Sequence, residues 1–123
     1  WLYTRDAAEG VHHEALVKRE ATLIEAPAAP GLGMDLEFIL ADLAAREINE
    51  VLVEAGAKLA GAFVAADLCD ELVVYQAPVL LGHQARPALA LPEPGALAEV
   101  ARWEITDETR IGDDLRLTLR PAR

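Results

Sequence analysis

Apolar residues recur at helical spacing in two segments of the chain. In the first segment four of them stand at positions i, i+3, i+4 and i+7: Leu36, Ile39, Leu40 and Leu43. This spacing predicts an amphipathic helix that begins after Asp35, whose side chain suits an N-cap, and runs to about Glu47. A second helix is predicted over residues 57–66, where the apolar positions again have helical spacing.

Short apolar runs predict strands at four places: 1–4, 21–25, Val51–Val53 and 72–75. The run Val51–Val53 is continuous rather than alternating, which is typical of a strand buried on both faces of a parallel sheet. Together with the helix at 57–66 and the strand at 72–75, it predicts a right-handed βαβ crossover. The segment His13–Arg19 fits a short helix or a strand.

The last third of the chain has a different pattern. Residues 100–106 and 115–119 alternate between apolar and polar side chains, and Asp107–Asp114, which contains Gly112, separates them. This pattern predicts an antiparallel hairpin. Residues rich in proline and glycine predict loops over 26–33 and 79–95, and residues 5–10 are polar enough for a third loop. The elements together predict an α/β fold with a mixed sheet.

Composition narrows the class of protein. The chain has 123 residues, which allows one domain at most, and a formal net charge of −10, which argues against binding to nucleic acid or to an anionic membrane. Glu54 and Lys58 interrupt its most apolar stretch, so we expect no membrane span. The single cysteine, Cys69, excludes an internal disulfide and a cysteine-rich zinc site. We therefore expect a cytoplasmic protein.

A metal site is not expected either. His12, His13 and Glu14 are adjacent, but the sequence has no second cluster of ligands at a suitable spacing.

The strongest candidate for chemistry is the segment from Glu54 to Ala62, where a predicted strand ends and a helix begins. Helix N-termini present free N–H groups to anions, and Gly56 can adopt a positive φ and let a phosphate approach the backbone. Gly61 allows close packing against a ligand or a strand. The spacing matches neither the dinucleotide-binding motif nor a P-loop. An ordinary strand-to-helix turn with a glycine that packs the helix is the alternative interpretation.

Glu54 favours the functional interpretation, since a carboxylate that ends an apolar strand should face water or a ligand. An ion pair with Lys58, four residues along the helix, is the structural alternative.

Four segments in this order resemble the reductase domain of the bifunctional riboflavin biosynthesis deaminase/reductase family: 51–56, 59–63, 70–72 and 77–82. The ending Gly112–Leu115 is similar to the closing hairpin of that family. The resemblance implies a dihydrofolate-reductase-like fold, and an enzyme that reduces 5-amino-6-(5-phosphoribosylamino)uracil with NADPH, so that the ribosyl chain becomes a ribityl chain. It also implies a homodimer.

The resemblance implies site residues as well. Glu54 matches the glutamate that contacts the sugar-phosphate substrate. The residues that match the segment holding the NADPH phosphates are Gly56, Ala57, Lys58, Leu59, Ala60, Gly61 and Ala62. Members of the family often have proline and then a hydroxyl residue after the glycine, where this chain has Ala57 and Lys58. No catalytic residue is assigned.

The resemblance covers only the second half of that reductase domain, and the chain begins at Trp1, with Met34 as its single methionine. We therefore interpret residues 1–123 as a C-terminal portion of the domain. The alternative is a non-catalytic module with the same fold that binds a ligand or forms dimers.

Overall fold

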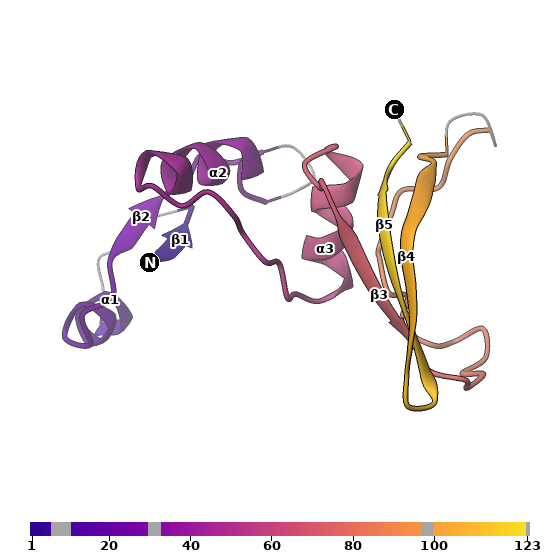
Figure 1. The fold of residues 1–123 in the computed structure, drawn as a ribbon. Coiled ribbons are helices and arrows are strands. Elements are labelled where there is room, and N and C mark those ends of the chain that lie inside the picture. Colours follow the sequence, from indigo (N-terminus) through magenta and orange to yellow (C-terminus); the bar gives the residue numbers. More distant parts are fainter. Residues whose placement is uncertain (6–10, 30–32, 97–99, 123) are drawn as a thin grey trace. The chain divides into compact units, whose positions relative to one another are not determined.

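The computed structural model describes residues 1–5, 11–29, 33–96 and 100–122. The chain divides into two compact units, Trp1–Val53 and Glu54–Arg123 (Figure 1).

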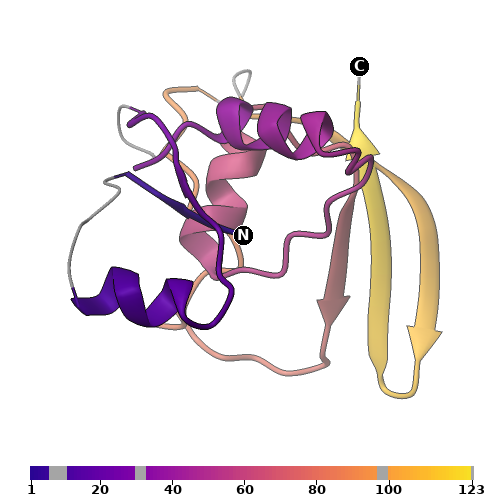
Figure 2. The ribbon, with the colours of Figure 1, turned by 90° about the vertical axis from the view of Figure 1, so that its left-hand side faces the viewer.

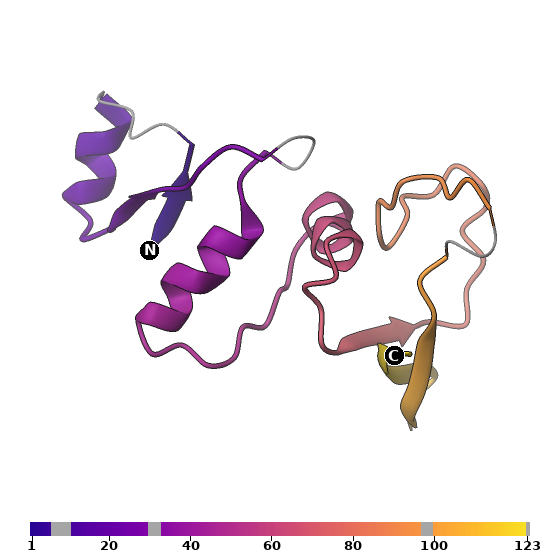
Figure 3. The same ribbon diagram turned by 90° about the horizontal axis from the view of Figure 1, so that it is seen from above.

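The first unit is a βαβ unit followed by a helix. Strand β1 (Leu2–Thr4), helix α1 (Val11–Val17) and strand β2 (Leu23–Glu25) precede helix α2 (Leu36–Ala45). The two strands run parallel (Figure 3). Their ladder pairs Leu2 with Leu23 and Thr4 with Glu25. Both strand predictions are confirmed, and of the two structures predicted for His13–Arg19 the helix is the one that forms. The described parts of the predicted loop at 26–33 are irregular, whereas the loop at 5–10 lies mostly outside the described residues.

Helix α2 begins where its sequence predicts. Asp35 is the N-cap, and its Oδ1 accepts a hydrogen bond of 3.0 Å from the N–H of Phe38. Leu36 is buried, as is Ala26 at the end of β2. The helix ends at Ala45, two residues before the expected end, because Glu47 has a left-handed backbone with φ of 64°.

A polar network joins α2 to β1. The hydroxyl of Tyr3 donates a hydrogen bond of 2.7 Å to Oδ2 of Asp42, and the Arg46 guanidinium donates to both Asp42 oxygens at 2.8 and 3.2 Å. The guanidinium of Arg46 also lies 4.9 Å from the ring centroid of Trp1. Hydrogen bonds from Arg46 and then from Tyr3 hold the pKa of Asp42 below its usual range. The network therefore favours the ionised carboxylate.

The strand predicted at Val51–Val53 is wrong, and so is the βαβ crossover predicted over residues 51–75. Residues 51–56 have no regular secondary structure, and the side chain of Leu52 is 81% exposed. A strand requires backbone hydrogen bonds to a neighbouring strand, and no described segment pairs with this one. The βαβ unit of this chain is β1–α1–β2 instead.

The second unit places one helix beside an antiparallel sheet. Its elements are α3 (Ala57–Ala65), β3 (Leu72–Gln76), β4 (Trp103–Ile111) and β5 (Asp114–Pro121), with the strands in the order β3-β5-β4 (Figure 2). The helix and strand predicted at 57–66 and 72–75 are confirmed, as is the terminal hairpin. On β5 the leucines at 115, 117 and 119 are half-buried and share a face with Leu72 and Val74.

The hairpin connection is shorter than the predicted segment Asp107–Asp114. Ile111 pairs with Asp114, so only Gly112 and Asp113 form the turn, and the φ of 62° at Gly112 suits the first position of a two-residue hairpin turn. A bulge at Thr106 shifts the register between Ile105 and Asp107. This extra residue interrupts the alternation of apolar and polar side chains along β4. The alternating pattern in the sequence therefore ends at Thr106, whereas the strand continues to Ile111.

The long loop after β3 packs closely against α3. The N–H of Ala90 donates a hydrogen bond of 2.9 Å to the carbonyl oxygen of Ala57. A Cβ atom placed on Gly61 would lie 2.9 Å from the nitrogen and the carbonyl carbon of Ala90, and closer still to its carbonyl oxygen. Glycine at position 61 therefore allows two backbone segments to touch.

The Asp42 network makes the stability of the first unit depend on pH. Because the folded-state pKa of Asp42 is depressed, its contribution is present above the usual carboxyl pKa of about 4 and is lost as the pH falls through the folded value. We expect the urea midpoint of the first unit to fall more steeply with acidification in the parent chain than in Asp42→Asn. Trp1 fluorescence in a Trp103→Phe background reports on this unit, and Glu37→Gln, an exposed position of α2, is the control. Equal pH profiles for the parent and Asp42→Asn would contradict the assignment.

The contact at Gly61 predicts the sign of a substitution. Alanine is the better helix former by up to about 1 kcal/mol, yet in Gly61→Ala its methyl group would meet backbone atoms rather than a flexible side chain. We expect Gly61→Ala to destabilise the second unit by about 1–3 kcal/mol. Ala65→Gly, at an exposed position of the same helix, should cost up to about 1 kcal/mol. Trp103 fluorescence in a Trp1→Phe background measures both, and a stabilising Gly61→Ala would show that the close contact is absent in solution.

Candidate functional site

The N-terminus of α3 is free of a side-chain cap. Gly56 is the N-cap residue, and its carbonyl oxygen accepts hydrogen bonds from the N–H groups of Leu59 and Ala60 at 3.1 and 3.2 Å. The N–H groups of Ala57 and Lys58 have no hydrogen-bond partner among the described residues. Helix α2, by contrast, has Asp35 in the capping position. The first turn of α3 is therefore able to receive the oxygens of an anion.

Gly56 contributes to this site in a different way from the one predicted. Its φ is −69° and its ψ is 164°, an extended conformation that any residue adopts, so the expected positive φ is wrong. A Cβ atom placed on Gly56 would meet nothing within 4 Å. Glycine thus leaves the helix N-terminus open because it has no side chain to occupy the space or to cap the N–H groups.

Glu54 and Lys58 lie on either side of this turn and are both exposed. The ion pairs of the described residues are those of Arg46 with Asp42, Arg116 with Asp107 and Arg120 with Glu71, so the alternative pair between Glu54 and Lys58 does not form. A cation in the first turn opposes the positive end of the helix dipole, which a bound anion would offset. The carboxylate and the ammonium group remain available to a ligand.

The later residues of the predicted segment face the interior of the unit. Gly56, Lys58 and Leu59 are exposed, whereas Gly61 and Ala62 are buried. Gly61 adjoins Ala90, which is the packing role that the sequence left open.

The adjacent histidines and the single cysteine were the other candidates in the sequence. The described residues contain no group of three potential metal ligands, although the side chain of His12 lies outside them. Cys69 donates a hydrogen bond of 3.3 Å to the carbonyl oxygen of Glu71, and burial raises the pKa of its thiol. The thiol therefore stays protonated at neutral pH. No helix in the described parts of the chain is long and apolar enough to cross a membrane.

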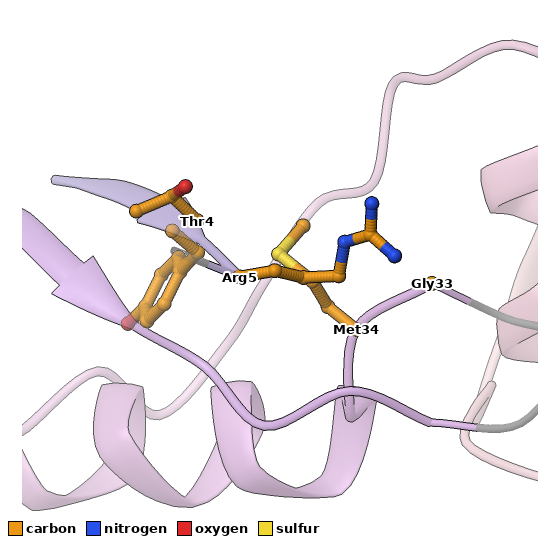
Figure 4. Close-up of a pocket in the computed structure, with 5 residues that line it drawn as sticks. Thr4, Arg5, Gly33 and Met34 are labelled. Atoms are coloured by element: carbon orange, nitrogen blue, oxygen red, sulfur yellow. The ribbon is translucent and has the colours of Figure 1, made fainter. Parts of the chain in front are cut away.

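A pocket in the first unit was missed by the sequence analysis. It has a volume of about 420 Å³ and lies at the carboxyl end of β1, where its lining residues are Tyr3, Thr4, Arg5, Gly33 and Met34 (Figure 4). The sequence predicted Tyr3 and Thr4 at the end of a strand, and it showed Arg5 and Gly33 only as the edges of two loops. An arginine directly after the first strand of a βαβ unit was the available signal, because ligands of α/β sheets bind at the carboxyl ends of strands.

Sequence comparison identifies relatives of the chain. Residues 1–117 match the family model of the RibD C-terminal domain. Riboflavin biosynthesis protein RibD of Haemophilus influenzae is 43% identical over 86 residues, which are 70% of this chain. The 5-amino-6-(5-phosphoribosylamino)uracil reductase of Buchnera aphidicola is 36% identical over 85 residues, with 69% of this chain and 41% of that protein covered. The match covers 23% of the Haemophilus protein, so the chain spans about a quarter of its length.

Solved structures agree with the fold. RibD of Acinetobacter baumannii has a TM-score of 0.78 at 30% identity, and the match covers 89% of this chain and 29% of that one. A riboflavin biosynthesis protein from Shewanella, at 21% identity and a TM-score of 0.65, supports the fold over 98% of this chain and 59% of its own. These neighbours confirm the fold class predicted from the sequence, a mixed α/β fold of the dihydrofolate-reductase type. The chain belongs to the RibD C-terminal domain family.

Proposed function

We propose that this chain carries part of the cofactor and substrate site of a riboflavin biosynthesis reductase. The reaction is the NADPH-dependent reduction of 5-amino-6-(5-phosphoribosylamino)uracil to the ribitylamino product. Membership of the RibD family supports the reaction, as does the activity for which the Buchnera relative is named. The observation that carries the proposal is the uncapped, open N-terminus of α3 between Glu54 and Lys58.

The residues at this turn fit a dinucleotide phosphate. The N–H groups of Ala57 and Lys58 are without partners among the described residues, and the space beside Gly56 is open. Lys58 adds a positive charge at the same end of the helix. Backbone N–H groups and an ammonium group are typical donors to phosphate oxygens.

The chain's own residues bind and orient the reactants in this proposal. NADPH, when bound, supplies the hydride. The first turn of α3 holds the phosphates, and the exposed carboxylate of Glu54 accepts hydrogen bonds from hydroxyl groups of the sugar-phosphate chain. Their contribution to the rate is positioning, which accounts for a large part of the barrier reduction in reactions between two bound molecules. No residue of this chain is assigned a proton transfer.

We further propose that the enzyme is a cytoplasmic homodimer that acts on a small molecule and has no nucleic-acid or membrane partner. The net charge of −10 supports the exclusion of polyanionic partners. The outer edges of β3 and β4 have no partner strand in the described part of the chain, which leaves backbone groups available for pairing. Analytical ultracentrifugation measures the state directly, and a monomer at all concentrations would contradict this part.

Gly56→Asp separates cofactor binding from stability. The backbone at position 56 accepts aspartate without strain. The new carboxylate would cap the free N–H groups and stabilise α3 by about 0.3 kcal/mol. The same carboxylate would repel a phosphate. We expect NADPH affinity, measured by fluorescence titration of the 123-residue chain and of a longer protein that carries it, to fall by about tenfold or more.

Gly56→Asn is the matched control, because it has the shape and capping ability of aspartate without the charge. It should lower affinity less than Gly56→Asp does. Unchanged NADPH affinity in Gly56→Asp would refute the site. The non-catalytic module would be favoured by two results together. Neither the 123-residue chain nor the longer protein would bind NADPH, and the longer protein would not oxidise NADPH with the ribosylaminouracil phosphate.

A further inference from the structure

The pocket at the end of β1 is built from two loops that meet at one edge of the parallel strand pair. Arg5 follows directly after Thr4, the last residue of β1, while Gly33 and Met34 come from the loop that joins β2 to α2. Because β1 and β2 are parallel, both loops leave the sheet at the same edge. Figure 4 shows the Arg5 side chain extending from the strand toward the Gly33–Met34 segment.

Backbone hydrogen bonds hold both walls of this pocket. The N–H of Ala26 donates to the carbonyl oxygen of Thr4 at 2.8 Å, which continues the pairing of the strands past β2. The N–H of Asp35 donates to the carbonyl oxygen of Pro27, also at 2.8 Å, and so closes the loop that contains Gly33. The pocket is therefore anchored on both sides by the fold of this unit.

Arg5 has the properties of a ligand-binding arginine. Its side chain is exposed, and none of the described residues forms an ion pair with it, although acidic side chains outnumber basic ones by 21 to 11 in the chain. Arg46, in the same unit, is paired with Asp42. Gly33 has a φ of 87°, and a Cβ atom placed on it would meet nothing within 4 Å, so the wall opposite Arg5 is open.

We propose that this pocket binds the phosphate monoester of a ribose, with Arg5 as the phosphate ligand. A guanidinium group donates two parallel hydrogen bonds to a phosphate, and it keeps its charge at every physiological pH. Tyr3, Thr4, Gly33 and Met34 complete the lining of the pocket. The volume of about 420 Å³ lies in the range of small-molecule sites, which is about 300–1,000 Å³.

The choice of ligand rests on the proposed function. Both reactants of the proposed reaction carry such a group, namely the 2′-phosphate of NADPH and the 5-phosphate of the ribosyl substrate. The shared chemistry is a dianionic phosphate on a ribose, and two small probes separate the sources: 2′-AMP, which carries only the 2′-phosphate, and ribose 5-phosphate.

The test is a titration of the 123-residue chain with each probe, followed by the amide NMR signals of Thr4, Arg5, Gly33 and Met34. We expect at least one probe to shift these signals, and adenosine, which lacks phosphate, to leave them in place. Arg5→Gln should weaken binding of that probe by about tenfold or more. Arg19→Gln removes an exposed arginine of the same unit outside the pocket and should leave the affinity unchanged.

The outcomes also separate this proposal from the preceding one. A probe that binds to the parent chain and equally to Arg5→Gln would overturn the assignment, and so would the absence of shifts with both probes. The tighter of the two probes identifies the source of the phosphate. The amide signals of Thr4, Arg5, Gly33 and Met34 report on this pocket, whereas the NADPH affinity of Gly56→Asp reports on α3, so the proposed function can fail at α3 while the Arg5 pocket stands, and the reverse also holds.

Discussion

The close approach of the Ala90 backbone to α3 is the constraint on which the second unit depends. The loop between β3 and β4 is long and mostly exposed, and its contact with α3 requires that position 61 has no side chain. The same contact engages the carbonyl oxygen of Ala57, in the first turn of the helix, while the N–H groups of that turn remain without partners among the described residues. The buried side of α3 is therefore occupied by the chain itself, and its N-terminal end remains uncapped.

The two longer helices show how capping separates a structural terminus from a candidate site. The carboxylate of Asp35 caps the N–H of Phe38 in the first turn of α2, and the Tyr3–Asp42–Arg46 network connects the same helix to β1, so a side chain of the protein already occupies the N-terminus of α2. Gly56 leaves the first turn of α3 uncapped at some expense of helix stability, since a capping side chain is worth about 1 kcal/mol relative to alanine and a few tenths relative to glycine. This uncapped terminus beside the exposed Lys58 is the arrangement on which the proposed phosphate site rests.

Local signals in the sequence predicted the elements that depend on neighbouring residues. Helical spacing and a capping aspartate located α2, and alternation located the hairpin strands. The predictions failed where contacts with a distant part of the chain determine the local structure. The run Val51–Val53 is strand-like in composition, yet no described strand pairs with it. The bulge at Thr106 could not be predicted because it depends on the register of β4 against β5. The pocket at Arg5 could not be predicted because two loops line it together, at positions 5 and 33, which are 28 residues apart in the sequence.

The sequence by itself determined the family, the class of fold and the segment Glu54–Ala62 as the candidate site, because ordered motifs and periodicity are properties of neighbouring residues. Only the tertiary structure decided what each glycine of that segment does. Gly56 leaves an open helix end with an ordinary backbone conformation, and Gly61 makes room for a backbone from another part of the chain. The physical reason is that steric space around a residue is defined by whatever packs against it, and for Gly61 that residue is Ala90, which lies 29 positions away in the sequence.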